Sequence, residues 1–471
     1  MHETFFDAAL ADAKVLDEHF AQHKSPIGPL HGVPVSLKDQ FHVKGVETTM
    51  GYTGWIGTFE GKTDDPRYLK EESEMVRELR NLGAILYCKT SVPHTLMSGE
   101  TVNNIIPNGY TWNPKNRNLS AGGSSGGEGA LIGLKGSPVG FGTDIGGSIR
   151  IPAAFNGLYG IRPTAGRLPY SGMANSMDGQ NSVLSVVGPL GTTAGAVTLA
   201  TRAILSQSPW LFDPLVVNIP WRDAEEQAVY DLIKSTSGKG QLAFGVMRSD
   251  GIANPDPPVL RAVNLVVAAL EKAGHKIIEW KPPSHQRLLD FTFKTWLYDG
   301  GKDIHQAFGL SGEPISPQVS MTYGDKPKEE FTATSIAENN RVKLTFQKEY
   351  LDYWNSTALT SGTNRPVDGV IAPLAPYPAA RPEKYKYYGF SAFVNGLDYT
   401  AVVVPVTLAD KNVDKYADDY TPISDTDKVV FEDYDAELYD GAHVSVQIVG
   451  RRFTEEKMLA IAGYVGGLIG K

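Results

Sequence analysis

The sequence predicts a single large α/β domain in which a mixed, twisted β-sheet is covered by helices on both faces. One β-α-β unit is the clearest observation: apolar strands at 242–247 and 276–280 flank a helix at 258–273. Alternation of this kind is typical of an α/β sheet, and further short apolar runs elsewhere are typical of buried strands. No repeat, low-complexity tract or Pro/Ser-rich linker divides the chain, so we expect one domain spanning residues 1–471.

The first half of the chain predicts four helices and two strands. Apolar residues recur at helical spacing through 4–23, which indicates an amphipathic helix whose apolar face is formed by Phe5, Ala8, Ala9, Ala13, Leu16 and Phe20. A strand at 33–37, a charged helix at 70–83 that ends at Gly83, and a strand at 84–88 follow. Residues 98–121 predict a loop, and helices are predicted from Gly126 and at 192–206.

The second half continues with the β-α-β unit and then with aromatic-rich segments. Residues 284–308 and 335–356 predict helices, and 370–372 and 401–404 predict buried strands that end at Pro373 and Pro405. Residues 408–438 are dense in Asp, Lys and Tyr, which indicates a surface excursion. A strand at 443–449 and a helix at 454–468 complete the predicted elements.

The charge balance excludes several classes of partner. The net charge is −9 and the pI is about 5.6, whereas nucleic acids and anionic membranes require a basic face. No apolar signal region opens the chain and no run of about 18 apolar residues occurs, so no membrane span is expected. The one cysteine, Cys88, is predicted to be a buried strand residue, and a chain without an intrachain disulfide fits a cytoplasmic location.

Two glycine-flanked serines lie 24 residues apart. Ser124 belongs to Gly-Gly-Ser-Ser-Gly-Gly-Glu-Gly-Ala at 122–130, and Ser148 belongs to Gly-Thr-Asp-Ile-Gly-Gly-Ser-Ile-Arg-Ile-Pro at 142–152. Flanking glycines let the backbone approach a substrate closely. The successive N–H groups of 145–148 can converge on one developing negative charge and so form an oxyanion hole. A serine at the end of such a nest is well placed to attack a carbonyl group.

Together with Gly-Val-Pro-Val-Ser-Leu-Lys-Asp at 32–39, these motifs resemble the amidase-signature family. The resemblance runs from about residue 4 to the end of the chain, includes 444–452, and is nearest to the fungal acetamidase branch and the fatty acid amide hydrolases. It implies hydrolysis of a small-molecule carboxamide to a carboxylic acid and ammonia or an amine, through an acyl-enzyme and without a cofactor. Members of this branch carry further N-terminal helices, which we expect to be missing here. We therefore expect either an exposed apolar patch at the 4–23 helix or a second copy of the chain, as in a homodimer.

The resemblance also implies a role for individual residues. It places the nucleophile at Ser148, the base at Lys38, and a bridging serine at Ser124, which follows a cis peptide bond from Gly123. The remaining positions that it implies are the oxyanion hole at Ile145, Gly146 and Gly147, a brace for the nucleophile loop at Asp144 and Arg150, and the substrate pocket at Leu96 and Met97.

A lysine base places demands on its surroundings. A serine hydroxyl needs a base, and lysine serves as one only when its amine is neutral. Because burial disfavours the ammonium and lowers the lysine pKa, we expect Lys38 to be buried within hydrogen-bond reach of Ser124, which in turn reaches Ser148. The carboxylate of Asp39 would raise the lysine pKa if it faced the ammonium, so we predict that it points away.

Three other interpretations fit parts of the sequence. Gly122 to Gly126 also satisfies G-x-S-x-G, the nucleophile elbow of α/β-hydrolases, with Ser124 as nucleophile and Asp440 and His443 as its partners. That interpretation leaves the 142–152 motif unexplained. A phosphate-binding loop is disfavoured because the glycine-rich stretch fits neither nucleotide-binding pattern. A catalytically inactive relative is disfavoured because all three catalytic positions are filled.

Metal chemistry and the substrate are less well defined by the sequence. The ten histidines are scattered and no H-E-x-x-H occurs, so no metal is expected, and local hydrogen bonding is predicted for His31, His42 and His94. The substrate stays open among small aliphatic amides, arylalkyl amides such as indole-3-acetamide, and longer acyl amides. Five aromatic residues of the middle section either line an acyl pocket or belong to the core: Trp296, Tyr298, Phe308, Phe346 and Trp354.

Overall fold

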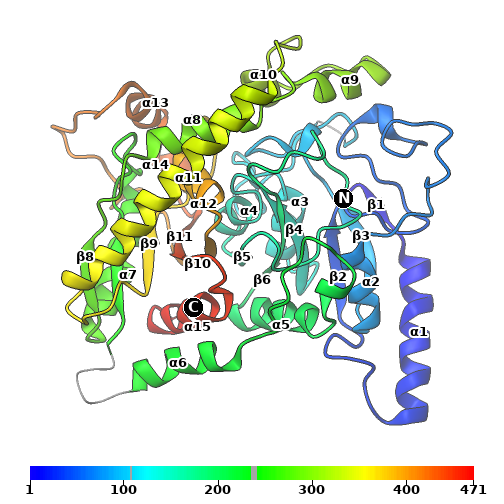
Figure 1. The fold of residues 1–471 in the computed structure, drawn as a ribbon, viewed down its shortest axis with the longest axis horizontal. Helices are drawn as coiled ribbons and strands as arrows, with labels where there is room; N and C mark the ends of the chain where they lie inside the picture. The colour runs from blue at the N-terminus through cyan, green and yellow to red at the C-terminus, as the bar shows by residue number, and fades with distance from the viewer. Residues whose placement is uncertain (107–108, 235–240, 471) are drawn as a thin grey trace.

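The computed structural model describes residues 1–106, 109–234 and 241–470. Their strands are β1 (Glu3–Thr4), β2 (Pro34–Lys38), β3 (Ile85–Thr90), β4 (Val139–Asp144), β5 (Tyr159–Arg162), β6 (Val186–Gly191), β7 (Ala243–Val246), β8 (Lys276–Glu279), β9 (Gly369–Ala372), β10 (Thr400–Leu408) and β11 (His443–Gly450). Within the described residues these eleven strands form one sheet in the order β1-β3-β2-β4-β6-β5-β10-β11-β9-β7-β8 (Figure 1). The pairs β2–β3, β2–β4, β7–β8 and β7–β9 are parallel and the other pairs are antiparallel, so the sheet is mixed, as predicted.

The α-helices alternate with these strands along much of the chain. They are α1 (Phe6–His23), α2 (Glu74–Asn81), α3 (Gly126–Gly133), α4 (Arg150–Phe155), α5 (Ala194–Leu205), α6 (Asp223–Lys234), α7 (Pro257–Lys272), α8 (His285–Thr295), α9 (Lys302–Ser311), α10 (Pro317–Tyr323), α11 (Ala333–Ser356), α12 (Gly389–Leu397), α13 (Asp425–Asp433), α14 (Ala436–Tyr439) and α15 (Glu455–Leu468). Short 3₁₀ turns include η1 (Thr53–Trp55) and η2 (His94–Leu96).

Helices cover both faces of the sheet because successive strand residues point to opposite sides. On β7, Phe244 packs in one core with α7 and α15, whereas Ala243 packs in a second core with α8, α11 and α12. On β11, Ile448 belongs to the first core and Val449 to the second. Figure 1 shows α15 and α11 on either side of the central strands. The predicted two-sided α/β architecture is confirmed.

The predicted β-α-β unit is also present, with β7 and β8 paired in parallel and joined through α7. The helix ends just before Gly274, whose φ of +89° is a conformation that favours glycine. The predicted strand at 84–88 and the predicted helices from Gly126, at 192–206 and at 454–468 correspond to β3, α3, α5 and α15. The predicted loop at 98–121 includes residues 107 and 108, which lie outside the described residues.

Several predicted boundaries were wrong. The helix predicted at 70–83 spans only α2, because Ser73 has an extended backbone and its N-terminal neighbours do not continue the helix. The helix predicted at 284–308 is divided into α8 and α9. Gly300 and Gly301, with φ of +68° and +79°, separate them, because these backbone values interrupt an α-helix.

Two segments in the last third of the chain also differ from the prediction. Pro405 does not end a strand: β10 runs on to Leu408, and a register shift between Pro405 and Thr407 accommodates the proline, which has no N–H to donate. The predicted surface excursion at 408–438 contains α13 and α14. It is anchored by buried residues such as Asp427 and Val430.

The N-terminal helix is present and buries only part of its apolar surface. α1 packs beside β3, with Ala9 and Leu16 buried. Four large apolar side chains of the helix are exposed, Phe6 by 54 %, Leu10 by 68 %, Val15 by 61 % and Phe20 by 47 %. The expectation of an exposed apolar patch or a second copy at this helix stays a prediction. In the described part of the chain, no helix is both long enough and apolar enough to cross a membrane.

Candidate active site

Sheet topology brings together the lysine motif at 32–39 and the two glycine-rich motifs at 122–130 and 142–152. β2 ends at Lys38 and β4 ends at Asp144, and the two strands are parallel neighbours. Because the carboxyl ends of parallel neighbours meet at one edge of the sheet, Lys38 lies beside the turn that carries Ser148. Ser124 lies just before the start of α3, which packs on both β2 and β4.

Lys38 is buried and has two hydroxyl neighbours. Its side chain is almost fully enclosed, and Nζ lies 2.8 Å from Ser124 Oγ and 2.6 Å from Thr143 Oγ1. Burial lowers the pKa of Lys38 to about 7, although the carboxylates of Asp144 and Glu128 act in the opposite direction. The expected burial of the lysine and its contact with Ser124 are confirmed.

Asp39 points away from the lysine, as predicted. Its Oδ2 accepts hydrogen bonds from the backbone N–H groups of Thr49 at 3.0 Å and Met50 at 2.8 Å. Its Oδ1 lies 3.5 Å from the ammonium of Lys89, which is also buried. The negative charge next to Lys38 in the sequence is therefore balanced by a second lysine.

The two serines line one cavity. The peptide bond between Gly123 and Ser124 is cis, as the resemblance implied. Ser124 and Ser148 both line this cavity, where Ser148 is only 7 % exposed. Among the described residues Ser148 Oγ has no hydrogen-bond partner, so the expected hydrogen bond between the two serines is not formed in this structure. Catalytic hydrogen bonds are often completed only when a substrate is bound.

The turn after β4 presents several backbone N–H groups. Gly147 N–H donates to Asp144 Oδ1 at 2.8 Å, so the oxyanion-hole role predicted for Gly147 does not fit this geometry. Among the described residues, the N–H groups of Ile145, Gly146 and Ser148 donate to no protein acceptor. These three N–H groups adjoin the cavity and leave a nest in which negative charge can be stabilised.

Gly147 has a different function in this turn. Its φ of +131° favours glycine, and a Cβ atom at this position would lie 2.7 Å from Ile151 Cδ1. Glycine therefore lets the turn reverse direction sharply, and its N–H tethers the turn to the Asp144 carboxylate.

Asp144 and Arg150 hold this turn together. Arg150 Nε donates to Asp144 Oδ2 at 3.0 Å and Nη2 donates to Oδ1 at 3.1 Å, with both side chains fully buried. Arg150 also donates to Asn395 Oδ1 and Gln447 Oε1. Burial raises the pKa of Asp144, but the guanidinium outweighs it and holds that pKa at about 2. The predicted brace is formed by these contacts.

Leu96 and Met97 lie where a substrate pocket was predicted. Both line the cavity shared by the serines and also an adjoining one, in which Ser148 faces Trp296, Tyr323 and Tyr388. The two cavities are small, with volumes of about 20 and 30 Å³. Of the five aromatic residues of the middle section, only Trp296 lines them. The other four are buried elsewhere: Tyr298, Phe308, Phe346 and Trp354.

Several residues of the site were not predicted from the sequence. Thr143 and Gln40 join the lysine network through Thr143 Oγ1, which donates to Gln40 Oε1 at 2.6 Å. Thr143 belongs to the motif of Ser148, and Gln40 follows Lys38 by two residues. Their closeness in sequence to these residues could have identified both as part of the site. The lining residues Asn175, Ser176 and Ser185 come from a loop segment without periodicity, and nothing in the sequence pointed to them.

The partners needed for a nucleophile elbow are not at the serines. Asp440 accepts a hydrogen bond from the backbone N–H of Lys411, and the ring of His443 lies against Gly157. Among the residues described, neither side chain lines the cavities of Ser124 or Ser148. The structure therefore does not support Ser124 as the nucleophile of a Ser-Asp-His triad.

The histidines near the motifs make local contacts, as predicted. His31 Nδ1 accepts from Ile27 N–H, His42 Nε2 lies 3.2 Å from Glu60 Oε1, and His94 Nε2 lies 3.3 Å from Glu313 Oε2. Over residues 1–106, 109–234 and 241–470, no group of three or more His, Cys, Asp or Glu residues is placed to hold a metal ion.

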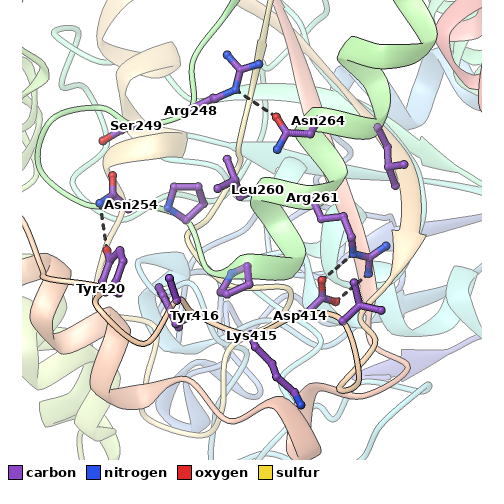
Figure 2. Close-up of a pocket in the computed structure, with 15 residues that line it drawn as sticks. Arg248, Ser249, Asn254, Leu260, Arg261, Asn264, Asp414, Lys415, Tyr416 and Tyr420 are labelled. Atoms are coloured by element: carbon purple, nitrogen blue, oxygen red, sulfur yellow. Dashed lines mark hydrogen bonds and ion pairs between the residues drawn. The ribbon is translucent and has the colours of Figure 1, made fainter.

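A larger cavity, of about 680 Å³, lies between α7 and the segment before α13 (Figure 2). Six of its polar side chains are hydrogen-bonded in pairs, which Figure 2 shows as Arg261–Asp414, Asn254–Tyr420 and Arg248–Asn264. This cavity contains no serine beside a buried base. Size alone therefore does not identify the reactive site of this molecule.

The fold and the cluster of buried lysine, paired serines and unused backbone N–H groups define a hydrolase that acts on acyl bonds. Comparison with known proteins narrows this class. The family model described as Amidase matches residues 1–459. The chain belongs to the amidase family, and it hydrolyses the carbon–nitrogen bond of amides.

Individual relatives agree with this assignment. The chain is 47 % identical over 469 residues to an acetamidase of Emericella nidulans, covering 100 % of this chain and 82 % of the relative. It is 48 % identical over 470 residues to an acetamidase of Aspergillus oryzae, covering 100 % and 83 %. A solved structure of a fatty acid amide hydrolase is 32 % identical with a TM-score of 0.88, covering 100 % of this chain and 78 % of that one.

Proposed function

We propose that this enzyme hydrolyses small aliphatic primary amides, with Ser148 as nucleophile, Ser124 as proton relay and Lys38 as base. The observation that carries the proposal is the 2.8 Å separation of Lys38 Nζ and Ser124 Oγ, at the wall of a cavity that Ser148 also lines. A lysine with a pKa of about 7 is neutral in a large fraction of molecules near neutral pH. Such an amine accepts a proton, whereas an exposed lysine does not.

In the acylation step, Ser148 Oγ attacks the carbonyl carbon of the amide. Its proton passes to Ser124 Oγ while the Ser124 proton passes to Lys38 Nζ, which becomes an ammonium. The carbonyl oxygen gains negative charge and is stabilised by the N–H groups of Ile145, Gly146 and Ser148. The carbon–nitrogen bond then breaks, the nitrogen takes a proton back through Ser124, and ammonia leaves with Lys38 neutral again.

Deacylation uses the same groups in the same order. Water attacks the carbonyl carbon of the Ser148 ester and gives up a proton through Ser124 to Lys38. The tetrahedral intermediate releases the carboxylic acid, and Ser148 Oγ recovers its proton by the reverse route. Asp144 and Arg150 keep the turn in place through both steps without touching the reacting atoms.

The dimensions of the site support a small acyl group. The cavities at Ser148 are only about 20 and 30 Å³, and aromatic rings of Trp296, Tyr323 and Tyr388 form one wall. Cavities of this size hold about one water molecule each, so any amide requires the lining to move, and a short acyl group requires the smallest movement. Two relatives that are 47 % and 48 % identical to this chain are named acetamidases, and acetamide is a small aliphatic primary amide.

A panel of primary amides tests the substrate class. The purified enzyme is assayed for ammonia release from acetamide, propionamide, hexanamide, phenylacetamide and indole-3-acetamide at equal concentration. We expect kcat/KM to be highest for the two shortest amides and to fall with acyl length. A preference for indole-3-acetamide or hexanamide over acetamide would overturn the small-amide proposal while leaving the amidase activity in place.

Location and assembly are further proposals. We propose a cytoplasmic enzyme, which is supported by a single buried cysteine, Cys88, in a chain without disulfides. We also propose a homodimer, which is supported by the exposed apolar side chains of α1 such as Leu10 and Phe20. Light scattering of wild type and Leu10→Glu tests the second point, since a monomeric wild type would contradict it.

A further inference from the structure

Gln40 lies in the active site although it belongs to no part of the Ser-Ser-Lys cluster. Its side chain is buried and lines the cavity that holds both serines. The orientation of its amide is determined by Ala174, whose backbone carbonyl oxygen lies 2.7 Å from Nε2. A carbonyl oxygen only accepts hydrogen bonds, so the NH₂ group must face Ala174. The amide oxygen Oε1 consequently faces Thr143.

The direction of the next two hydrogen bonds follows from this orientation. Gln40 Oε1 can only accept, so the hydroxyl of Thr143 donates its one proton to it, across 2.6 Å. Thr143 Oγ1 then has no proton left for Lys38 and can only accept from Nζ, which lies 2.6 Å away. Starting from a backbone carbonyl, the direction of the whole chain of hydrogen bonds is determined.

This direction matters for a neutral lysine. A neutral amine has two N–H donors and a single lone pair, and the lone pair is the part that takes a proton. If Thr143 donated to Lys38, it would occupy that lone pair. Because Thr143 accepts instead, one N–H of Lys38 is used at Thr143 and the lone pair is left for the hydroxyl proton of Ser124, 2.8 Å away.

We propose that Gln40 is a positioning residue that keeps the lone pair of Lys38 directed at Ser124 by holding the proton of Thr143. The inference rests on the proposed role of Lys38 as base. The other contacts of Gln40 Nε2 are consistent with it: Tyr170 OH donates to Asn175 Oδ1 and so accepts from Gln40, at 2.8 Å. These contacts fix the amide from the side away from Thr143.

The charged and titratable groups around Lys38 do not replace this function. Glu128 of α3 accepts from the hydroxyls of Ser36 and Thr90. Asp144 at the end of β4 is paired with Arg150, and Asp39 is paired with Lys89 of β3. Burial raises the pKa of the phenol of Tyr170 to about 12, so it stays protonated. Of these groups, none forms a hydrogen bond with Thr143 Oγ1 in the described structure.

Gln40→Met provides the first test, since methionine keeps the length and volume of glutamine without its polar atoms. Without the acceptor oxygen of Gln40, the hydroxyl of Thr143 donates its proton to Lys38 Nζ and occupies the lone pair of the amine. We expect plateau kcat to fall about 10- to 100-fold at little-changed KM. The pH at which activity rises should stay at about 7 or move lower, because donation to the amine favours its neutral form.

A purely structural role predicts the opposite pH shift. A loosened site admits water to Lys38 and moves its pKa up towards the ordinary value of 10.5, so the rise in activity would move to higher pH. Gln40→Glu is the second variant, because a glutamate also presents an oxygen to the Thr143 proton. We expect its plateau kcat at about pH 9.5 to stay within about 3-fold of wild type. Loss in Gln40→Glu as large as in Gln40→Met would overturn the inference.

A double-mutant comparison completes the experiment. Thr143→Val removes the hydroxyl that would donate to Lys38 in the Gln40→Met enzyme. The Gln40→Met/Thr143→Val enzyme should therefore be no slower than Thr143→Val alone. A double variant whose loss in kcat equals the product of the losses in the two single variants would contradict the proposal. Gln347→Met is the matched control, since Gln347 on α11 also donates to a backbone carbonyl, that of Gly396 at 3.0 Å, and should behave as wild type. If Lys38→Met stays active, the proposed base is wrong; if it is inactive while both Gln40 variants match wild type, only this inference fails.

Discussion

The indole ring of Trp296 lies directly against the backbone of Gly146. A Cβ atom on Gly146 would be 2.8 Å from both Cζ2 and Cη2 of the ring, which is closer than real side chains approach. Trp296 is in turn packed edge-on against Phe293 and Tyr388, at centroid distances of 5.1 and 6.1 Å. The ring therefore packs on a residue whose N–H belongs to the proposed oxyanion hole, and it lines the same cavity as Ser148.

Shortening Trp296 should therefore widen the acyl side of the pocket. In Trp296→Ala we expect the ratio of kcat/KM for hexanamide to that for acetamide to rise by about 10-fold or more, since each methylene in an apolar pocket changes selectivity about 10- to 200-fold. Ammonia release from both amides measures the ratio. Trp296→Phe keeps an aromatic wall and serves as the control. An unchanged ratio in Trp296→Ala would show that this ring does not limit acyl length.

The two serines should differ in their reaction with a fluorophosphonate probe. Ser148 adjoins the free N–H groups of Ile145 and Gly146, so it is the residue expected to carry the covalent label. Ser148→Ala should abolish labelling, and Ser124→Ala should slow it by about 10²-fold or more because the proton relay is lost. Intact mass and peptide mapping identify the labelled residue. Labelling that survives in Ser148→Ala and vanishes in Ser124→Ala would support the nucleophile-elbow interpretation instead.

The activity should depend on pH through Lys38. The base works as a neutral amine, and burial lowers its pKa to about 7, so kcat should be low in acid and rise as pH increases through about 7. Lys38→Met keeps the apolar stem and removes the amine. We expect its kcat to be about 10²- to 10⁴-fold lower and nearly independent of pH. Stopped assays from acid to alkaline pH on both proteins measure this, and a fast Lys38→Met enzyme with the wild-type pH profile would refute the base.

Much of this site could be predicted because its chemistry is local in the sequence. The two glycine-flanked serines, Ser124 and Ser148, are visible in the sequence itself, and the resemblance of the three motifs to the amidase-signature family assigned the roles of Lys38 and Asp144. The strand and helix of the β-α-β unit were equally visible, since periodic apolar residues report directly on burial. An electrostatic argument was enough to predict that the carboxylate of Asp39 points away from Lys38.

The rest of the site depends on tertiary contacts that the sequence does not show. The wall opposite Ser148 comes from residues far along the chain, Trp296, Tyr323 and Tyr388, and each looks like an ordinary core aromatic in the sequence. The resemblance assigned Gly147 to the oxyanion hole together with Ile145 and Gly146, but the direction of its N–H depends on where the Asp144 carboxylate lies. Pro405 misled the strand prediction because a register shift that accommodates a proline leaves no mark in the sequence.

Stability offers a prediction independent of the active site. Glu78 on α2 has a fully buried side chain, and the only side-chain partner of its carboxyl among the described residues is the carboxylate of Glu74. Burial, followed by the negative charge of Glu74, raises the pKa of Glu78 to about 9. The carboxyl is therefore protonated in the folded protein at neutral pH, whereas in the unfolded chain it ionises near 4.5.

The sign of the pH effect follows from this difference. Since the folded pKa is raised above the unfolded value, the stabilisation that Glu78 has in acid is lost progressively as pH rises from about 4.5 to about 9. Glu78→Met removes the titration and places an apolar side chain of similar length at this buried position. We expect Glu78→Met to unfold at a higher temperature than wild type at about pH 8, with the gap shrinking towards about pH 4.5. Thermal unfolding followed by circular dichroism across this range measures the gap, and Glu271→Met, which removes an exposed carboxylate near the end of α7, is the control. A Glu78→Met protein whose advantage is absent at pH 8, or grows towards acid, would show that the Glu78 carboxyl is not held in its neutral form.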